Sequence, residues 1–349
     1  MARELKIGNL TAKIPVVQGG MGVGVSLSSL AGAVAAAGGI GVISTAQIGF
    51  RHPDFARNPI ECNLIAVKEE IRKAREKAMG GILGVNIMVV TRRYEDYVKA
   101  AVEAGIDLII SGAGLPMKLP ELVAGSLTKI APIVSGRKAL EVIVKYWTKK
   151  YQRLPDLVVV EGPKAGGHLG FSREELDRYE TASYDGEVVQ ILDYVKQIRR
   201  EYKQPIPVVV GGGVFNREDM DHYLALGADG VQMATRFVTT EECDAAPGFK
   251  EAYLAATKED VRIINSPVGL PGRAIANPFL EKVKEGCGTR VACRQCITTC
   301  NPATTPYCIT EALIRAVEGD TENGLIFCGS NVSKCCKLET VAEIMEEFQ

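Results

Sequence analysis

The sequence predicts a (β/α)8 barrel, because eight short apolar segments alternate with helical segments along the chain. Most of these segments are rich in β-branched residues and lack polar alternation, which is typical of parallel strands buried on both faces. The expected strands lie at residues 14–18, 40–44, 82–90, 107–110, 129–134, 158–160, 207–210 and 230–233. An open, doubly wound sheet shows the same alternation, so the periodicity alone leaves that alternative open.

Two further observations favour the closed barrel. Polar or glycine-rich residues follow the first, third, fourth, sixth, seventh and eighth strands, so they would converge on one rim. The loops after the seventh and eighth strands, where many barrels bind phosphate, are Gly211-Gly212-Gly213 and Ala234-Thr235.

The helices between the strands are expected at residues 26–37, 69–79, 94–104, 118–124, 139–151, 188–202 and 219–226. The first should begin at Ser26 as its N-cap and end at Gly38-Gly39. Residues 47–66 show no clean period and contain Pro53 and Pro59, so we expect a long loop there.

Composition narrows the class of protein. The chain has 349 residues, 46% hydrophobic and 24% charged, which are ordinary values for a globular protein. A net charge of −1 argues against nucleic acid as a partner, because there is no basic excess to neutralise phosphates. Neither a signal-peptide core nor a membrane-spanning run is present, so we expect a cytoplasmic protein, with homo-oligomerisation left open.

The loop after the sixth strand carries the residues best suited to catalysis. The strand ends at Glu161 and is followed by Ala165-Gly166-Gly167-His168, where the glycines allow a ligand to approach the backbone closely. Gly211–Gly213 and Gln232–Thr235 would offer N–H groups and a hydroxyl to a phosphate. The sequence has no Walker lysine motif and no dinucleotide fingerprint, so flavin mononucleotide (FMN) fits better than a nucleoside triphosphate.

Several motifs together resemble the nitronate monooxygenase (2-nitropropane dioxygenase) family, which also contains flavin-dependent enoyl-acyl-carrier-protein reductases. The motifs span residues 5–280 in order and are Gln18-Gly19-Gly20-Met21, Gly84–Met88, Ala165–His168, Gly212-Gly213-Val214, Gln232–Phe237 and Ser266–Ile275. The resemblance implies a barrel that binds FMN, with His168 handling the substrate proton. The cofactor residues that it implies are Gly19, Gly20, Met21, Asn86, Glu161, Gly166, Gly167, Gly212, Gly213, Gln232, Met233, Ala234 and Thr235.

The resemblance leaves the reaction open. We expect an FMN-dependent oxidoreductase that oxidises alkyl nitronates, with reduction of an enoyl thioester by NAD(P)H as the alternative. Glu161 and Leu169 stand where nitronate-oxidising members more often have Gln and Arg, and the turn Ser111-Gly112-Ala113-Gly114 also leans towards the reductases. A non-catalytic flavin or metal redox sensor is the second alternative.

The C-terminal segment is unusual because eight of the ten cysteines lie between Cys287 and Cys336. Such a cluster in a cytosolic chain favours metal or redox chemistry over disulfides. The run Cys293, Cys296, Cys300 and Cys308 could hold a [4Fe–4S] cluster, with zinc or unliganded thiols as alternatives. We therefore expect residues 1–280 to form the FMN-binding barrel and residues 281–349 a cysteine-rich extension.

Overall fold

The computed structural model describes residues 4–286 and 292–349, and its centre is a closed barrel of eight parallel strands. The strands pair in the order β3-β4-β5-β6-β7-β8-β10-β11, and β11 pairs back with β3. Their bounds are β3 (Val16–Gln18), β4 (Ile40–Ser44), β5 (Ile82–Met88), β6 (Leu108–Gly112), β7 (Lys129–Val134), β8 (Val158–Glu161), β10 (Val208–Gly211) and β11 (Gly230–Met233). The predicted barrel is confirmed, and the open sheet is excluded.

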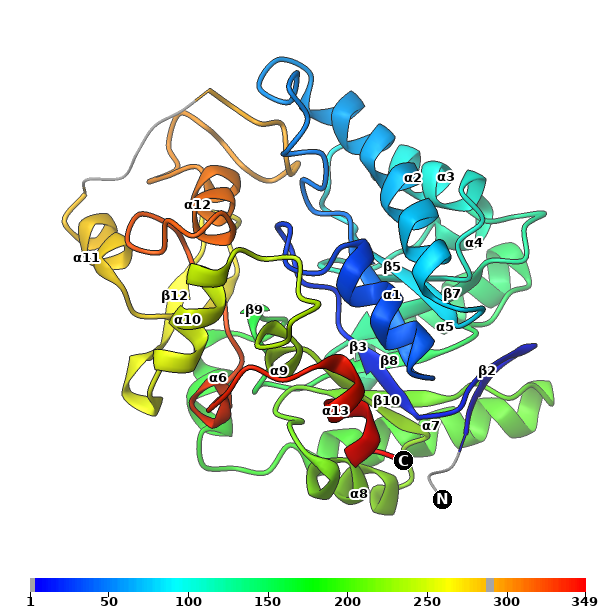
Figure 1. Ribbon diagram of the computed structural model, residues 1–349. Helices are drawn as coiled ribbons and strands as arrows, with labels where there is room; N and C mark the ends of the chain where they lie inside the picture. Colours follow the sequence, from blue (N-terminus) through cyan, green and yellow to red (C-terminus); the bar gives the residue numbers. More distant parts are fainter. Residues whose placement is uncertain (1–3, 287–291) are drawn as a thin grey trace.

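The helices that follow the strands cover the outside of the barrel (Figure 1). They are α1 (Ser28–Ala36), α2 (Pro59–Lys77), α3 (Tyr94–Glu103), α4 (Leu119–Leu122), α5 (Arg137–Tyr151), α7 (Asp185–Tyr202), α8 (Arg217–Leu226) and the short α9 (Thr235–Val238). The largest cluster of buried apolar side chains lies between these helices and the strands, with Trp147 of α5 among its fully buried members. This packing fixes the ends of the strands, where the loops begin.

Two predictions about helix starts were wrong. Helix α2 begins at Pro59 and not near residue 69, because a proline fits the first turn of a helix, where its missing N–H is not needed. Ser26 does not cap α1, and its hydroxyl accepts the N–H of Met21 at 2.8 Å. The carboxylate of Asp244 accepts N–H groups of the first turn of α1, including that of Leu27 at 2.8 Å.

A hairpin of β1 (Leu5–Ile7) and β2 (Leu10–Ala12) closes the end of the barrel at which the strands begin. Leu5 and Ile7 are buried there with Val17, Leu108 and other residues of the strands. The hairpin therefore leaves the opposite end of the barrel, where the strands finish, accessible to a ligand.

The chain beyond β11 builds a second layer over the other end of the barrel. It contains α10 (Pro247–Ala255), β12 (Val261–Asn265), β13 (Pro271–Ile275), α11 (Pro278–Lys284), α12 (Ile309–Val317) and α13 (Val341–Glu347), with short 3-10 turns η1 (Lys258–Asp260) and η2 (Val332–Lys334). Strand β13 pairs with both β12 and the two-residue β9 (Gly167–His168). Figure 1 shows α10, α11 and α12 together on one side of the barrel, while α13 lies beside α1.

The C-terminal residues share a core with the barrel loops. Val332 and Cys328 are buried in one apolar cluster with Val23 and Val25 of the loop after β3. An ion pair ties the segment down further, because both carboxylate oxygens of Glu339 accept from the guanidinium of Arg236 at 3.0 Å. The division into a barrel of residues 1–280 and an extension of residues 281–349 stays a prediction.

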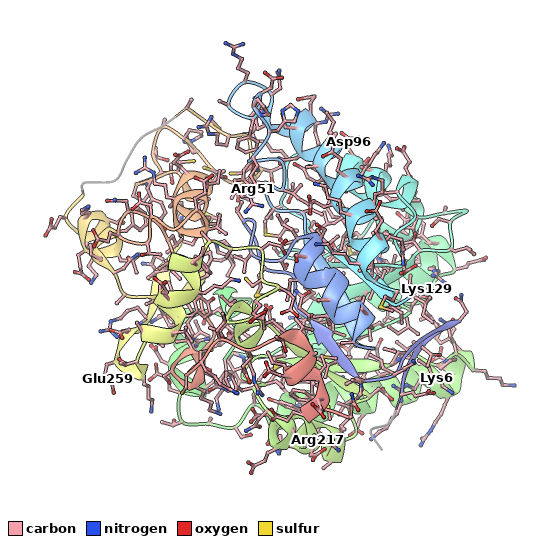
Figure 2. The ribbon with its side chains drawn as sticks, viewed as in Figure 1. Lys6, Arg51, Asp96, Lys129, Arg217 and Glu259 are labelled. Atoms are coloured by element: carbon pink, nitrogen blue, oxygen red, sulfur yellow. The ribbon has the colours of Figure 1, made fainter. Side chains whose placement is uncertain are left out.

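Charged side chains such as Lys6, Arg217 and Glu259 lie at the periphery of the molecule (Figure 2). Within the described residues, no helix has the length and apolar character needed to span a membrane.

The loop between β8 and α7, which is polar and acidic in sequence, contains one more helix, α6 (Arg173–Tyr179). Ser172 caps it, accepting the N–H of Glu175 at 3.2 Å while the Glu175 carboxylate accepts the N–H of Ser172 at 2.8 Å. Tyr179 packs edge-on against Phe171 and Tyr184, so this loop is held by an aromatic cluster.

Candidate active site

A cavity of about 260 Å³ opens at the end of the barrel where the strands finish. Loops after β3, β4, β5, β6, β8, β10 and β11 line it, and so do residues of α10, α12 and the segment 325–331. The predicted convergence of polar and glycine-rich loops on one rim is therefore confirmed. A second cavity of about 50 Å³ adjoins the first and has mainly apolar walls.

His168 lies between the two cavities and lines both of them. The pairing of β9 with β13 holds its backbone, and its Nε2 lies 2.7 Å from the hydroxyl oxygen of Ser266. The ring of Phe327 packs edge-on against the imidazole, with centroids 5.0 Å apart. Burial lowers the pKa of His168 to about 4, so its imidazole is neutral at pH 7.

Glu161 ends β8 inside the larger cavity. Burial raises the pKa of its carboxyl to about 7, because no described cation offsets the cost of removing the charge from water. Near neutral pH, part of the Glu161 population is therefore protonated and can donate a hydrogen bond. The rest is ionised and can only accept one.

Two glycines show how closely the walls approach one another. A Cβ on Gly20 would lie 2.5 Å from the Cβ of Asn86, which faces it across the cavity rim. Gly213 has a φ of +93°, which side chains other than glycine rarely adopt, and a Cβ there would lie 3.1 Å from Lys164. Glycine at both positions therefore lets these walls of the cavity lie this close together.

The structure brings together almost all of the residues that the sequence predicts for the cofactor. Gly19, Gly20, Met21, Asn86, Glu161, Gly166, Gly167, Gly212, Gly213, Gln232, Ala234 and Thr235 line the larger cavity. Met233 does not, because β11 turns its side chain into the apolar cluster under α1 and α13, while its carbonyl accepts the N–H of Gly19 at 2.8 Å. A role for Met233 would thus be to fix the position of Gly19.

Several residues of the site were not singled out from the sequence. Arg273 donates to the carbonyl oxygens of Pro163 (2.9 Å) and Ala165, and so holds the loop that carries His168. Ser330 and Asn331 line the cavity from the C-terminal segment. The motif around Ser266 and Arg273 was a signal in the sequence, whereas nothing local marks residues 327–331.

The predicted turn that begins at Ser111 both stabilises the barrel and contributes to its rim. The Ser111 hydroxyl donates to the carbonyl of Ile87 at 2.7 Å and lies 2.9 Å from the hydroxyl of Tyr94. Gly112 and Ala113, which follow it, line the larger cavity.

The predicted metal ligands give a different result. Cys293 is exposed, and Cys296, Cys300 and Cys308 are partly buried. Burial is the main cause that raises the thiol pKa of the latter three, and neighbouring cysteines add to it. Within residues 4–286 and 292–349, no group of three or more His, Cys, Asp or Glu side chains is placed to hold a metal ion, and Cys287 lies outside these residues. The [4Fe–4S] and zinc interpretations are therefore not supported.

Comparison with known proteins decides the family. The model of the nitronate monooxygenase family matches residues 3–349. The chain belongs to this family. The match extends beyond residue 280, so it includes the cysteine-rich segment. As a member of the nitronate monooxygenase family, the protein is an FMN-dependent oxidoreductase, and the alternative of a non-catalytic sensor is set aside.

Individual relatives agree with this assignment. A probable nitronate monooxygenase of Staphylococcus saprophyticus is 26% identical over 307 residues, which is 80% of each chain. The structure of FabK from Thermotoga maritima has a TM-score of 0.72 and 26% identity, covering 97% of this chain and 92% of FabK. A nitroalkane oxidase from Streptomyces ansochromogenes has a TM-score of 0.70 over 96% of this chain and 94% of its own. It is only 19% identical, so it supports the fold alone.

Proposed function

We propose that this enzyme oxidises small alkyl nitronates, with FMN in the larger cavity and the alkyl chain of the substrate in the smaller one. The observation that carries the proposal is that His168 lines both cavities. A proton-handling group at this junction would lie between the cofactor and an apolar substrate.

The residues of the larger cavity fit FMN in their chemistry. Backbone N–H groups and the Thr235 hydroxyl suit the phosphate, and the glycines leave room for the cofactor. When bound, FMN supplies an isoalloxazine ring that accepts electrons from the substrate. Asn86, Glu161 and the other predicted cofactor residues would bind and orient it.

His168 would act as a base towards the parent nitroalkane, whose carbon beside the nitrogen carries the acidic proton, and as a hydrogen-bonding group to the nitro oxygens of the nitronate. Ser266 lies at Nε2, while Nδ1 has no hydrogen-bond partner among the described residues. If Nε2–H donates to Ser266, the lone pair of Nδ1 is left to accept a proton. The pKa of about 4 favours this role over that of a general acid at neutral pH, because little imidazolium is present.

The smaller cavity supports a short alkyl group as the substrate chain. Its walls include Val23 of the loop after β3, Met88 at the end of β5, Val268 of the β12–β13 turn, and Ile309 and Leu313 of α12. Burying methylene groups against such walls stabilises the complex. A volume of about 50 Å³ leaves little room for a long acyl chain.

Substrate profiling of the purified protein tests this proposal. We expect oxygen uptake with ethyl-, propyl- and butyl-nitronate, and Val268→Phe should lower the kcat/KM ratio of butyl- over ethyl-nitronate about tenfold or more. Val268→Ala is the matched control and should leave that ratio equal or raise it. Absence of uptake with all three nitronates would contradict the proposal.

Reduction of an enoyl thioester by NAD(P)H is the second candidate. FabK, an FMN-dependent enoyl-acyl-carrier-protein reductase, is 26% identical over nearly the whole chain, and Glu161 stands where nitronate-oxidising members more often have Gln. Oxidation of NADH or NADPH that depends on crotonyl thioester, without nitronate turnover, would favour this reaction.

The cytoplasmic location and the homo-oligomeric state stay predictions.

A further inference from the structure

Residues 327–331, which we call the C-terminal strap, line the cavity and are hydrogen-bonded to three of its loops. The N–H of Gly329 donates to the hydroxyl of Thr235 at 3.1 Å. The N–H of Ser330 donates to the carbonyl of Lys164 at 3.1 Å, and the Asn331 amide donates to the carbonyl of Gly213 at 2.5 Å. The strap therefore touches the loops after β8, β10 and β11 together.

Ser330 is the member of the strap with an unused polar group. Its hydroxyl oxygen is buried and has no hydrogen-bond partner among residues 4–286 and 292–349, although the residue lines the larger cavity. A buried hydroxyl without a partner is costly, so native proteins rarely leave one in this state. Two other buried polar groups in the described chain also lack a partner, on Arg294 and Tyr307, but neither residue lines either cavity.

The neighbours of Ser330 indicate which end of the cavity it faces. On one side Gly329 binds Thr235, and on the other Asn331 binds Gly213. Both partners belong to the loops that offer N–H and hydroxyl groups to a phosphate. Phe327, at the start of the strap, packs instead against His168. The strap thus runs from the catalytic end of the cavity to the phosphate end.

We propose that the hydroxyl of Ser330 donates a hydrogen bond to the phosphate of FMN, so that the C-terminal strap forms an additional wall of the cofactor site. The proposal rests on FMN occupying the larger cavity, but not on which reaction the enzyme catalyses. Binding of the phosphate would give Ser330 the partner that it lacks. It would also make retention of the cofactor depend on a segment more than 80 residues beyond the barrel's last strand.

Flavin affinity measures this contact without any turnover. Apo protein prepared by removing the flavin is titrated with FMN, and separately with riboflavin, which lacks the phosphate. We expect Ser330→Ala to weaken FMN binding about tenfold or more, as for loss of a hydrogen bond to a charged group, and to leave riboflavin binding unchanged. Ser333→Ala, at an exposed serine of η2 outside the cavity, is the matched control and should bind both flavins like the wild type.

Two outcomes would overturn the proposal: wild-type affinity for FMN in Ser330→Ala, or equal weakening of FMN and riboflavin. Equal melting temperatures of the apo variants and the wild type would show that any loss is local. Because the experiment measures flavin affinity, failure of the enzyme to oxidise nitronates would contradict the proposed function without affecting this inference.

Discussion

The barrel loops and the C-terminal segment line the same cavity, but they reach it in different ways. Each barrel loop directly follows a buried strand, so its position is set by local sequence and by pairing within the barrel. The C-terminal strap is positioned by contacts with residues about 90 to 170 positions earlier in the chain, such as Thr235 and Lys164. A cofactor site can therefore have a local half, made of loops that follow strands, and a long-range half, made of a segment held by distant residues. Only the local half is visible as sequence motifs.

The largest effect is expected at the local half. Gly213→Leu should release most of the FMN, because the residue has a φ of +93° and its new side chain would meet Lys164 at the phosphate loop. Flavin content of the purified variant, from its absorbance near 450 nm, is the measurement. Gly80→Leu is the matched control, since Gly80 has a φ of +83° but nothing within 4 Å of its Cβ position. Full FMN occupancy in Gly213→Leu would mean that the phosphate site lies elsewhere.

A smaller effect, on stability, is expected from a substitution that weakens the attachment of the C-terminal segment. Glu339→Ala removes a buried carboxylate that pairs with Arg236 through both oxygens. Arg236 keeps Glu347 at 2.7 Å, so the free energy of unfolding should fall by about 3 kcal/mol, at the low end for a broken buried pair. Urea unfolding measures this loss. Glu346→Ala, at an exposed position of α13, should change it by less than about 0.5 kcal/mol.

The same ion pair predicts a dependence on pH. The guanidinium of Arg236 lowers the pKa of Glu339 below its ordinary value of 4.5, so the pair stabilises the fold above that pH. The contribution should be lost as the pH falls through the lowered pKa. The stability difference between wild type and Glu339→Ala should therefore narrow as the pH falls below 4.5 towards the lowered pKa, and a constant difference would contradict the account.

A further effect on stability concerns Glu161 in the apo protein. Its pKa is about 7 in the fold against 4.5 for an ordinary glutamate, so the folded state binds more protons between these values. The free energy of unfolding should therefore fall as pH rises from about 4.5 to about 7. Glu161→Gln should remove this slope, which unfolding curves at several pH values would reveal. An identical slope in the variant would place the titration on another group.

Sequence periodicity sufficed for the eight strands because they are buried on both faces, and glycine or polar residues follow six of them. It failed where the decisive contact is distant. Asp244, more than 200 residues away, accepts the N–H groups at the start of α1. No local sequence pattern could have shown that Asp244, and not Ser26, caps this helix. At Pro59 the error was local, since proline was interpreted as a loop residue although it suits the first turn of a helix.

The site was predictable to a similar extent. His168 and all but one of the predicted cofactor residues face one cavity, because they stand at the ends of barrel strands. The strap was missed, and Cys293, Cys296, Cys300 and Cys308 were interpreted as metal ligands from their spacing alone. Spacing along a chain does not fix where thiols point once α12 and its preceding loop pack against the barrel. Cys296 instead contributes to the wall of the smaller cavity.

The central claim is that His168 handles the substrate proton at the junction of the cofactor cavity and the apolar pocket. Steady-state kinetics and flavin content of His168→Ala test it most directly. We predict that the variant retains FMN but turns over a neutral nitroalkane or an enoyl thioester about 100-fold more slowly, or worse, as for loss of a general acid or base. Unchanged turnover in a variant that still holds FMN would contradict the account.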